Sequence, residues 1–320
     1  MTTEPLVSVV IPALNAAPWI GETITSCLKQ TWKRLEIIVV DNGSTDGTRD
    51  IVHSMIPSGV KLYECAYQNA SAARNVGTAR SNGTYLQYLD ADDILAPSKI
   101  ESQLSRLFEI DQDDMASGPW ARFEKVPGER ETEPEIIWQD LEPLQFLVRS
   151  WCGGGMMPIF GWLIPRRIID RAGVWNEALT LNDDGEFFTR VILESRHIRF
   201  CPRAMGYYRT SAATTLSKGT SRKALVSGLS STDLCSQHLL RVRNDAEARK
   251  SCACYYQRFA YSAYPYERDL AEEADRKADA LGGCDLAYPG GKMFQLLSAA
   301  IGWKRAMRLR HAIPHSGQRN

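Results

Sequence analysis

The chain has 320 residues, of which 44% are hydrophobic and 24% are charged. This balance allows one large α/β domain or two smaller ones, and it excludes a disordered chain or a small disulfide scaffold. Lysine plus arginine and aspartate plus glutamate number 38 each, so the chain lacks the basic field that nucleic-acid binding uses, and no nucleic-acid partner is expected. No run approaches 18 apolar residues and the N-terminus has no signal-peptide pattern, so a cytoplasmic location is expected.

Apolar, β-branched runs alternate with helical patterns over the first hundred residues. The predicted elements are, in chain order, a strand at 7–11, a helix at 20–28, a strand at 35–40, a helix at 48–55, a strand at 60–64, a helix at 71–80 and a strand at 84–89. This alternation predicts an α/β fold with a Rossmann-like open sheet flanked by helices. Ligands of such sheets bind beyond the carboxyl ends of the strands, where polar clusters follow Ile11, Val40 and Leu89. From about residue 221 onward the pattern is helical.

A glycine-rich polar turn at 41–47 follows the second predicted strand. Asp41 at its start is placed to accept hydrogen bonds from a nucleobase or a ribose. The same residue types also favour turns, and Ser44 or Asp46 could equally cap the next helix.

A second cluster places three carboxylates, Asp90, Asp92 and Asp93, directly after a strand. Carboxylates this close repel one another unless a cation joins them, and hard oxygen ligands suit Mg²⁺ or Mn²⁺. Such a metal would also bridge a diphosphate and stabilise charge as the phosphate leaves. The alternative is a solvated loop that caps the helix near Pro97.

A third acidic cluster, 182–186, precedes an aromatic helical pattern. One of its carboxylates could be a general base that takes a proton from an attacking hydroxyl. Alternatively, Asn182 caps the helix, and Asp183 and Asp184 suit its positive end. Arg74, near the start of the 71–80 helix, could reach a phosphate or a strand-end carboxylate, or be a plain surface residue.

Three segments in this order resemble glycosyltransferase family 2, the inverting enzymes of the GT-A fold. They read VSVVIPALNA, CLKQTWKRLEIIVVDNGSTDGT and NASAARNVGTARSNGTYLQYLDADD, and NDDGEFFTRV and Tyr207–Arg209 with the Ser/Thr-rich stretch after it continue the resemblance more thinly. The resemblance implies a GT-A catalytic domain over 1–220, with a nucleotide-sugar half at about 1–97 and an acceptor half at about 98–220. The remaining residues, 221–320, would form a helical C-terminal region.

The resemblance also implies a role for each matching residue. Pro12, Ala13, Leu14, Asn15 and Asp41 would line the nucleotide pocket, with Arg74, Asp90 and Ala91 also at the donor. Asp92 would bind the metal, Mn²⁺ or Mg²⁺, with Asp90 beside it. The base falls on Asp184, with Asp183 and Glu186 as lesser candidates. The family's usual Glu and aromatic residue are here Asp183 and Gly185, which puts the local geometry of the base in question.

The implied reaction is the transfer of a hexose with inversion from a nucleoside diphosphate sugar to a glycan or lipid-linked acceptor. UDP is the first choice of nucleotide, with dTDP and GDP as alternatives, and a cell-surface polysaccharide or lipopolysaccharide is the expected product. On the acceptor side, Trp120, Trp151 and Trp162 could stack on sugar rings or belong to the core. A sugar nucleotidyltransferase and a non-catalytic sugar-nucleotide-binding subunit remain as alternatives.

The end of the chain has its own charge. No acidic residue follows Asp285, whereas six basic residues do: Lys292, Lys304, Arg305, Arg308, Arg310 and Arg319. Apolar residues recur at helical spacing from Met293 to Ile301, which predicts an amphipathic helix over 292–313. Such a helix could touch the inner face of an anionic membrane, or dock on the catalytic domain with a solvated basic end.

Overall fold

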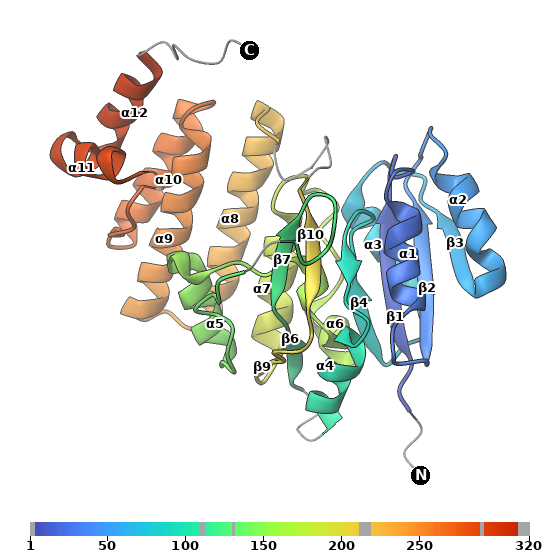
Figure 1. Ribbon diagram of the computed structural model, residues 1–320. Coiled ribbons are helices and arrows are strands. Elements are labelled where there is room, and N and C mark those ends of the chain that lie inside the picture. Colours follow the sequence, from blue (N-terminus) through green and yellow to red (C-terminus); the bar gives the residue numbers. More distant parts are fainter. Residues whose placement is uncertain (1–3, 109–112, 130–131, 211–218, 289–290, 313–320) are drawn as a thin grey trace.

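The computed structural model describes residues 4–108, 113–129, 132–210, 219–288 and 291–312 (Figure 1). A sheet flanked by helices forms one end of the molecule and a group of helices forms the other. The predicted α/β fold with a Rossmann-like sheet and a helical C-terminal region is confirmed. Residues 211–218, which hold most of the Ser/Thr-rich stretch, and Arg319 lie outside the described residues.

The central sheet has the strand order β3-β2-β1-β4-β8. Its strands are β1 (Val7–Ala13), β2 (Leu35–Asp41), β3 (Val60–Glu64), β4 (Tyr85–Tyr88) and β8 (Ile164–Pro165). The first four strands run parallel and β8 pairs antiparallel with β4, so the sheet is mixed. The apolar runs form these strands because both faces of a parallel sheet are covered.

Helices α1 (Ile20–Leu28), α2 (Thr48–Met55) and α3 (Ala70–Arg80) cross over between the parallel strands. α1 and α3 pack on opposite faces, since the side chains of α1 share a core with Val9 and Ile11, whereas those of α3 share one with Ile38 and Val40. A side chain at Gly77 would place its Cβ only 2.4 Å from the Val10 side chain. Glycine therefore lets α3 approach β1 closely.

The middle of the chain adds short elements to the α/β part of the molecule. They are β5 (Ile94–Leu95), α4 (Lys99–Phe108), β6 (Met115–Ser117), β7 (Trp120–Phe123), α5 (Pro143–Arg149), a short irregular helix η2 (Ser150–Gly154), α6 (Arg166–Ala172), α7 (Asp183–Glu194), β9 (Ile198–Phe200) and β10 (Gly206–Arg209). Strands β5, β10 and β7 form a second sheet, and β6 pairs with β9. These pairings join segments about a hundred residues apart in the sequence.

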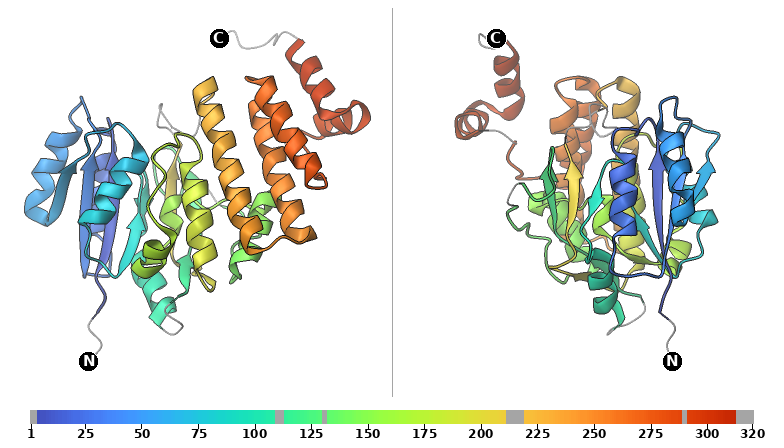
Figure 2. Two further views of the ribbon diagram at one scale, coloured as in Figure 1. Left: turned by 180° about the vertical axis from the view of Figure 1, so that it is seen from behind. Right: turned by 45° about the vertical axis from the view of Figure 1, so that its right-hand side comes forward.

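The C-terminal region consists of helices α8 (Arg222–Val242), α9 (Ala246–Ala263), α10 (Arg268–Ala280), α11 (Lys292–Ile301) and α12 (Trp303–Ala312). Side chains of Ser221 and Asp245 cap α8 and α9 by accepting backbone N–H groups. α8 lies beside α7 (Figure 2) and packs against it, so the helical region is joined to the α/β part of the molecule. None of the helices in the described ranges is both long and apolar enough to cross a bilayer.

The prediction of one continuous helix over 292–313 is wrong. The backbone φ of Gly302 is +82°, a left-handed conformation that interrupts helical hydrogen bonding and divides the segment into α11 and α12. Residue 313 lies outside the described residues.

Candidate active site

The loops that follow β1, β2 and β4 meet at the carboxyl end of the central sheet, where a cavity of about 580 Å³ opens. The register of β1 on β2 pairs Ala13 with Asp41, so the first two loops leave the sheet side by side. The predicted site residues that line the cavity are Pro12, Ala13, Leu14, Asn15, Arg74, Asp90, Ala91, Asp92, Asp183 and Asp184. Residues as far apart in the sequence as Pro12 and Asp184 thus share one concave surface.

Arg74, on α3, connects two of the acidic clusters. Its guanidinium donates hydrogen bonds to Asp90 and to Asp183, each at 2.9 Å, and lies 4.5 Å from the centre of the Trp175 ring. Burial lowers the pKa of Arg74, but the two carboxylates outweigh this effect and hold the pKa above its usual value. Arg74 is therefore a charged, buried link between the acidic clusters and not a surface residue.

Asp183 and Asp184 begin α7, and their partners differ. Asp183 accepts hydrogen bonds from the Ser71 hydroxyl at 2.8 Å and from Arg74. Asp184 accepts the backbone N–H of Gly185 at 2.9 Å. Burial, together with the charge of Asp183, raises the pKa of Asp184 to about 6 against the opposing effect of Arg74. Asp184 is thus the carboxylate whose surroundings suit a proton acceptor near neutral pH.

Glu186, the other lesser candidate for the base, faces away from the cavity. It is 3% exposed and accepts hydrogen bonds from Arg190 at 2.7 and 2.8 Å and from His238 at 3.1 Å. Burial raises its pKa, but His238 and Arg190 together hold the pKa below its usual value. Because Glu186 is paired and does not line the cavity, it is no longer a candidate for the base.

The second acidic cluster divides between the cavity and the interior. Asp90 and Asp92 line the cavity, whereas Asp93 is 1% exposed and accepts the backbone N–H of Arg209 at 2.9 Å. Burial and the neighbouring charge of Asp90 raise the pKa of Asp92 to about 6. Asp92 is therefore a carboxylate whose negative charge is incompletely compensated by the protein.

A comparison of the sequence with known protein families covers most of the chain segments that bring residues to this cavity. The family described as glycosyl transferase family 2 matches residues 8–172, just over half of the chain. The chain belongs to glycosyl transferase family 2. A curated relative, the UDP-Glc:α-D-GlcNAc-diphosphoundecaprenol β-1,3-glucosyltransferase WfgD of Escherichia coli, is 38% identical over 103 residues, which is 32% of this chain. The chain spans 41% of the length of WfgD, and less than half of other curated relatives that it matches with similar identity.

Solved structures extend the likeness over nearly the whole chain. Staphylococcus aureus TarS 1–349 in complex with UDP-GlcNAc superposes with a TM-score of 0.71 and 16% identity, covering 96% of this chain and 92% of that one. The mannosyltransferase PcManGT from Pyrobaculum calidifontis, in complex with GDP-Man and Mn²⁺, gives a TM-score of 0.55 and 17% identity, covering 97% and 80%. At these identities the comparison shows the fold, and this family 2 glycosyltransferase has the GT-A architecture.

The metal expected for this glycosyltransferase can be tested against the donor atoms present. Within the part of the chain that the structure describes, no group of three or more histidine, cysteine, aspartate or glutamate side chains is arranged to hold a metal ion. The predicted ligands Asp90 and Asp92 bring two carboxylates to the cavity, and Asp183 and Asp184 line it as well. Two oxygen ligands fit a hard dication only if a diphosphate and water supply the other ligands. The metal site stays a prediction that depends on a bound donor.

The nucleotide side of the cavity differs from the prediction at Asp41. Asp41 is 2% exposed, its carboxylate accepts the backbone N–H of Ser44 at 3.3 Å, and the described lining includes Asn42 in its place. Sequence analysis missed Asn42, which follows the observed end of β2 at Asp41 and fits the argument applied to Asp41. It also missed Asn69, whose side chain caps α3 by accepting the Ala72 N–H at 3.0 Å.

Of the two alternatives for the three tryptophans, the structure favours a place in the core. Trp120, Trp151 and Trp162 are 2%, 5% and 1% exposed, and none of them lines the cavity. Their rings pack on other aromatic side chains, as Trp151 does on Tyr255 with centroids 4.5 Å apart and Trp120 does on Tyr208. These faces are already covered, so they cannot stack on a sugar. The other apolar and aromatic residues of the lining are Met156, Pro158, Ile159, Leu179, Leu181 and Tyr208.

Proposed function

We propose that this protein transfers a hexose, with inversion, from a nucleoside diphosphate sugar to a hydroxyl group of a glycan or lipid-linked acceptor. The observation that carries the proposal is the meeting of Asp90, Asp92 and Asp184 in one cavity at the carboxyl end of the sheet. UDP is favoured as the nucleotide because TarS binds UDP-GlcNAc and WfgD is named for UDP-Glc. GDP is the main alternative, since PcManGT binds GDP-Man. The names of relatives favour a surface polysaccharide as the product.

In the proposed reaction the donor lies along the β1 and β2 loops with its diphosphate near Asp90 and Asp92. Asp184 takes the proton of the acceptor hydroxyl as that oxygen forms a bond to the anomeric carbon. The bond from the anomeric carbon to the diphosphate oxygen breaks, and its electron pair leaves with the nucleoside diphosphate. A Mg²⁺ or Mn²⁺ ion held by Asp92 and Asp90 would neutralise the charge that develops on the diphosphate.

The electrostatics around Asp184 support its role as the base. With a pKa of about 6, Asp184 is ionised at neutral pH and is more basic than an exposed aspartate. Arg74 supports the arrangement because it holds Asp183 beside Asp184 and Asp90 near the donor. We expect kcat to fall below about pH 6, as Asp184 becomes protonated.

The variant Asp184→Asn tests this proposal. We expect kcat to fall by about 10² to 10⁴-fold, because the amide cannot accept the proton, while donor binding stays within twofold. Turnover is measured as release of nucleoside diphosphate from UDP-sugars and GDP-mannose with Mn²⁺. Asp170→Asn, at an exposed carboxylate of α6, is the control and should retain full activity.

Three results would overturn parts of the proposal. Near-normal turnover of Asp184→Asn removes Asp184 from the role of base. Release of pyrophosphate from a nucleoside triphosphate and a sugar phosphate would identify a nucleotidyltransferase instead. Donor binding without turnover on any donor in the panel would favour the non-catalytic subunit.

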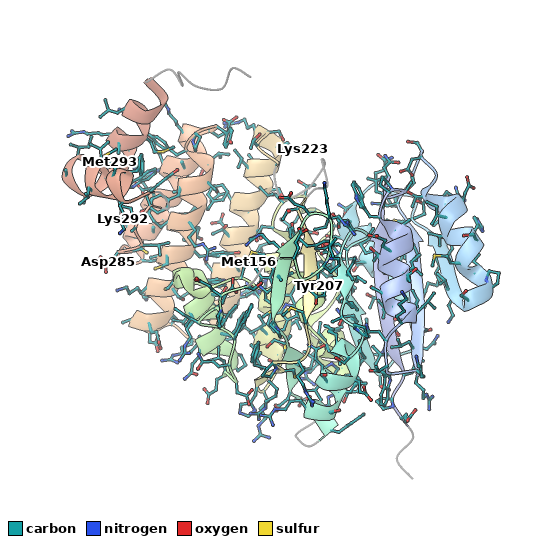
Figure 3. The ribbon with its side chains drawn as sticks, viewed as in Figure 1. Met156, Tyr207, Lys223, Asp285, Lys292 and Met293 are labelled. Carbon is teal, nitrogen blue, oxygen red and sulfur yellow. The ribbon has the colours of Figure 1, made fainter. Side chains whose placement is uncertain are left out.

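We also keep the proposed division into a catalytic domain over 1–220 and a helical region over 221–320, and propose that the latter meets the cytoplasmic face of a membrane. On α11, Met293, Leu296, Leu297 and Ala300 follow one another at helical spacing with exposed side chains, of which Met293 is 85% and Leu296 73% exposed. Lys292 and Met293 lie together at the end of the molecule opposite α2 (Figure 3). Since no acidic residue follows Asp285, an anionic lipid surface complements this end better than a second, equally basic copy does.

A further inference from the structure

The turn that carries Asp184 is held by helices that lie more than forty residues later in the chain. Ser227 of α8 accepts the backbone N–H groups of Thr180 at 2.8 Å and Leu181 at 3.3 Å. Ser231, one turn further along α8, donates to the Asn182 carbonyl at 2.6 Å. The backbone on the N-terminal side of Asp183 is therefore bonded to α8 at three successive residues.

The side chain of Asn182 is fixed in the same way. Its amide Nδ2 donates to the Ser231 hydroxyl and to the Tyr255 hydroxyl of α9, each at 2.8 Å. Asn182 has φ +59° and ψ +32°, a left-handed conformation that Asn tolerates but that still has a cost for a residue with a side chain. Although Asn182 occupies the N-cap position of α7, its side chain makes no capping bond to the helix. The bonds to Ser231 and Tyr255 hold it in place instead.

Gly185 is explained by the same arrangement. A Cβ at this position would lie 2.3 Å from Oδ1 of Asn182. The aromatic residue that the family resemblance leads one to expect at this position would displace the Asn182 side chain. The absence of a side chain at Gly185 therefore leaves room for the Asn182 side chain and its contacts. Together they fix the backbone around Asp184 at the start of α7.

Tyr255 connects this turn to another segment of the cavity lining. Its ring stacks on Trp151 with centroids 4.5 Å apart and planes 3° apart, while its hydroxyl accepts from Asn182. Trp151 belongs to η2, which leads directly to Met156 in the cavity wall. One residue of α9 therefore contacts both the segment that carries the base and the segment that leads to Met156.

We propose that α8 and α9 position the catalytic base, with Ser227, Ser231 and Tyr255 acting as positioning residues through Asn182. This inference rests on the proposed function, because it takes Asp184 as the base. The geometry requires the helical region for turnover and not for donor binding, since these three side chains do not line the nucleotide side of the cavity. A displacement of a reacting group by about 1 Å can reduce turnover by about 10²-fold, so the loss of these bonds affects kcat.

The experiment compares Tyr255→Phe and Ser231→Ala with two matched controls on the same helices. Tyr256→Phe removes the neighbouring hydroxyl of α9, which bonds to Asp233 within the helical region, and Ser230→Ala removes an exposed hydroxyl of α8 that bonds to Val226. We expect Tyr255→Phe and Ser231→Ala to lower kcat by about tenfold or more, with donor KM within twofold. We also expect a shift in the pH below which kcat falls. Both controls should keep kcat and this pH unchanged.

A second measurement does not depend on activity. Amide hydrogen exchange of the peptide that contains 179–185 should become at least fivefold faster in Ser231→Ala and Tyr255→Phe than in the controls, because the turn loses bonds that hold it. If both variants keep wild-type kcat and wild-type exchange, the inference is wrong. It is also wrong if the controls lose as much kcat as the two variants, since the effect would then be general destabilisation.

The two proposals fail in different ways. A wild-type protein without turnover on any donor counts against the proposed function, while the exchange rates still report whether α8 and α9 hold the turn. A wild-type protein with turnover, and variants with unchanged kcat, counts against the positioning role alone. Should Ser231→Ala fail to fold, Tyr255→Phe carries the same comparison, because it keeps the ring that stacks on Trp151.

Discussion

Asp183 and Asp184 are adjacent in the sequence, yet their surroundings give them different chemistry. Asp183 is paired with the Ser71 hydroxyl and with Arg74, whereas Asp184 accepts the Gly185 N–H and is half-buried beside a like charge. Burial and the charge of Asp183 raise the pKa of Asp184, and a carboxylate with a raised pKa is a common feature of acid–base sites. The assignment of the base to Asp184 therefore depends on partners that are a hundred residues away in the sequence.

The metal site is tested at a single residue, Asp92. We expect Asp92→Ala to abolish the dependence of nucleotide affinity on Mn²⁺, because it removes one of the two carboxylates that are proposed to hold the metal. In wild type the affinity for UDP should rise about tenfold or more with Mn²⁺, which corresponds to about 1.4 kcal/mol, and in the variant the ratio should be close to one. Isothermal titration calorimetry with UDP, with and without Mn²⁺, measures both values.

Asp170→Asn is again the control, since its carboxylate is exposed and lies outside the cavity. It should show the wild-type ratio of affinities. An unchanged ratio in Asp92→Ala would contradict the proposed metal site and leave the raised pKa of Asp92 without a functional meaning.

The sequence predicted the residues whose role follows from their place at a strand end. Pro12–Asn15, Asp90 and Asp92 line the cavity as expected, because the carboxyl ends of parallel strands share one edge. Asp41 and the three tryptophans do not line the cavity, because of the direction of their side chains. The Asp41 carboxylate turns back to the N–H of Ser44, which agrees with the turn chemistry that the sequence left as an alternative. The packing of the tryptophan rings depends on tertiary contacts that no local pattern encodes.

At the scale of whole elements, the sequence predicted the long ones and missed the short ones. The strand predicted at 60–64 and the helix at 48–55 have the bounds of β3 and α2, since apolar periodicity is clear over such lengths. Strands such as β5 and β8 have two residues each and no period of their own. Their positions follow from pairing with distant strands, as β8 pairs with β4.

The central sheet depends on one buried carboxylate, Glu36 of β2. It accepts hydrogen bonds from the Ser8 hydroxyl of β1 at 2.5 Å, from Lys61 of β3 at 2.7 Å and from the Asn82 and Gly83 N–H groups before β4. Burial raises the pKa of Glu36, but Lys61, Ser8 and Asn82 outweigh it and lower the pKa to about 2. One side chain thus links four neighbouring strands or their entries.

This pKa predicts how stability depends on pH. A carboxylate whose folded pKa is depressed contributes stability above its unfolded pKa of about 4.5, and that contribution is lost as the pH falls toward 2. At about 1.4 kcal/mol per pKa unit, we expect Glu36→Gln to lower the free energy of unfolding by about 3 kcal/mol at pH 7. The difference between wild type and variant should shrink steadily below pH 4.5.

Urea unfolding at a series of pH values measures this difference. Glu272→Gln, on an exposed position of α10, is the control and should differ from wild type by less than about 0.5 kcal/mol at every pH. A difference between wild type and Glu36→Gln that stays constant from pH 7 to pH 3 would show that packing, and not ionisation, accounts for the effect.

At the scale of the whole molecule, the charge is balanced overall but unevenly distributed along the chain. The total is 38 basic and 38 acidic residues, yet the segment after Asp285 has only basic ones. α12 docks on the helical region through buried Ala306 and Met307, whereas α11 buries none of its residues. The break at Gly302 therefore separates a docked helix from an exposed amphipathic one, a distinction that periodicity alone could not make.

The last prediction concerns this exposed face of α11. The double variant Met293→Ser, Leu296→Ser removes one methionine and one leucine side chain, which are 85% and 73% exposed, so the fold should be unaffected. We expect co-sedimentation with vesicles that contain anionic phospholipid to fall at least fivefold relative to wild type, because the apolar contact with the bilayer is lost. Binding of the wild-type protein should also weaken with added salt or in neutral vesicles, since the exposed Lys292 and its basic neighbours contribute by charge.

Val242→Ser, at an apolar position of α8 that is 67% exposed, is the matched control and should bind as wild type does. Equal sedimentation of the double variant and the control would contradict the membrane contact, and a variant that instead changes from oligomer to monomer in analytical ultracentrifugation would assign this face to a second copy of the chain.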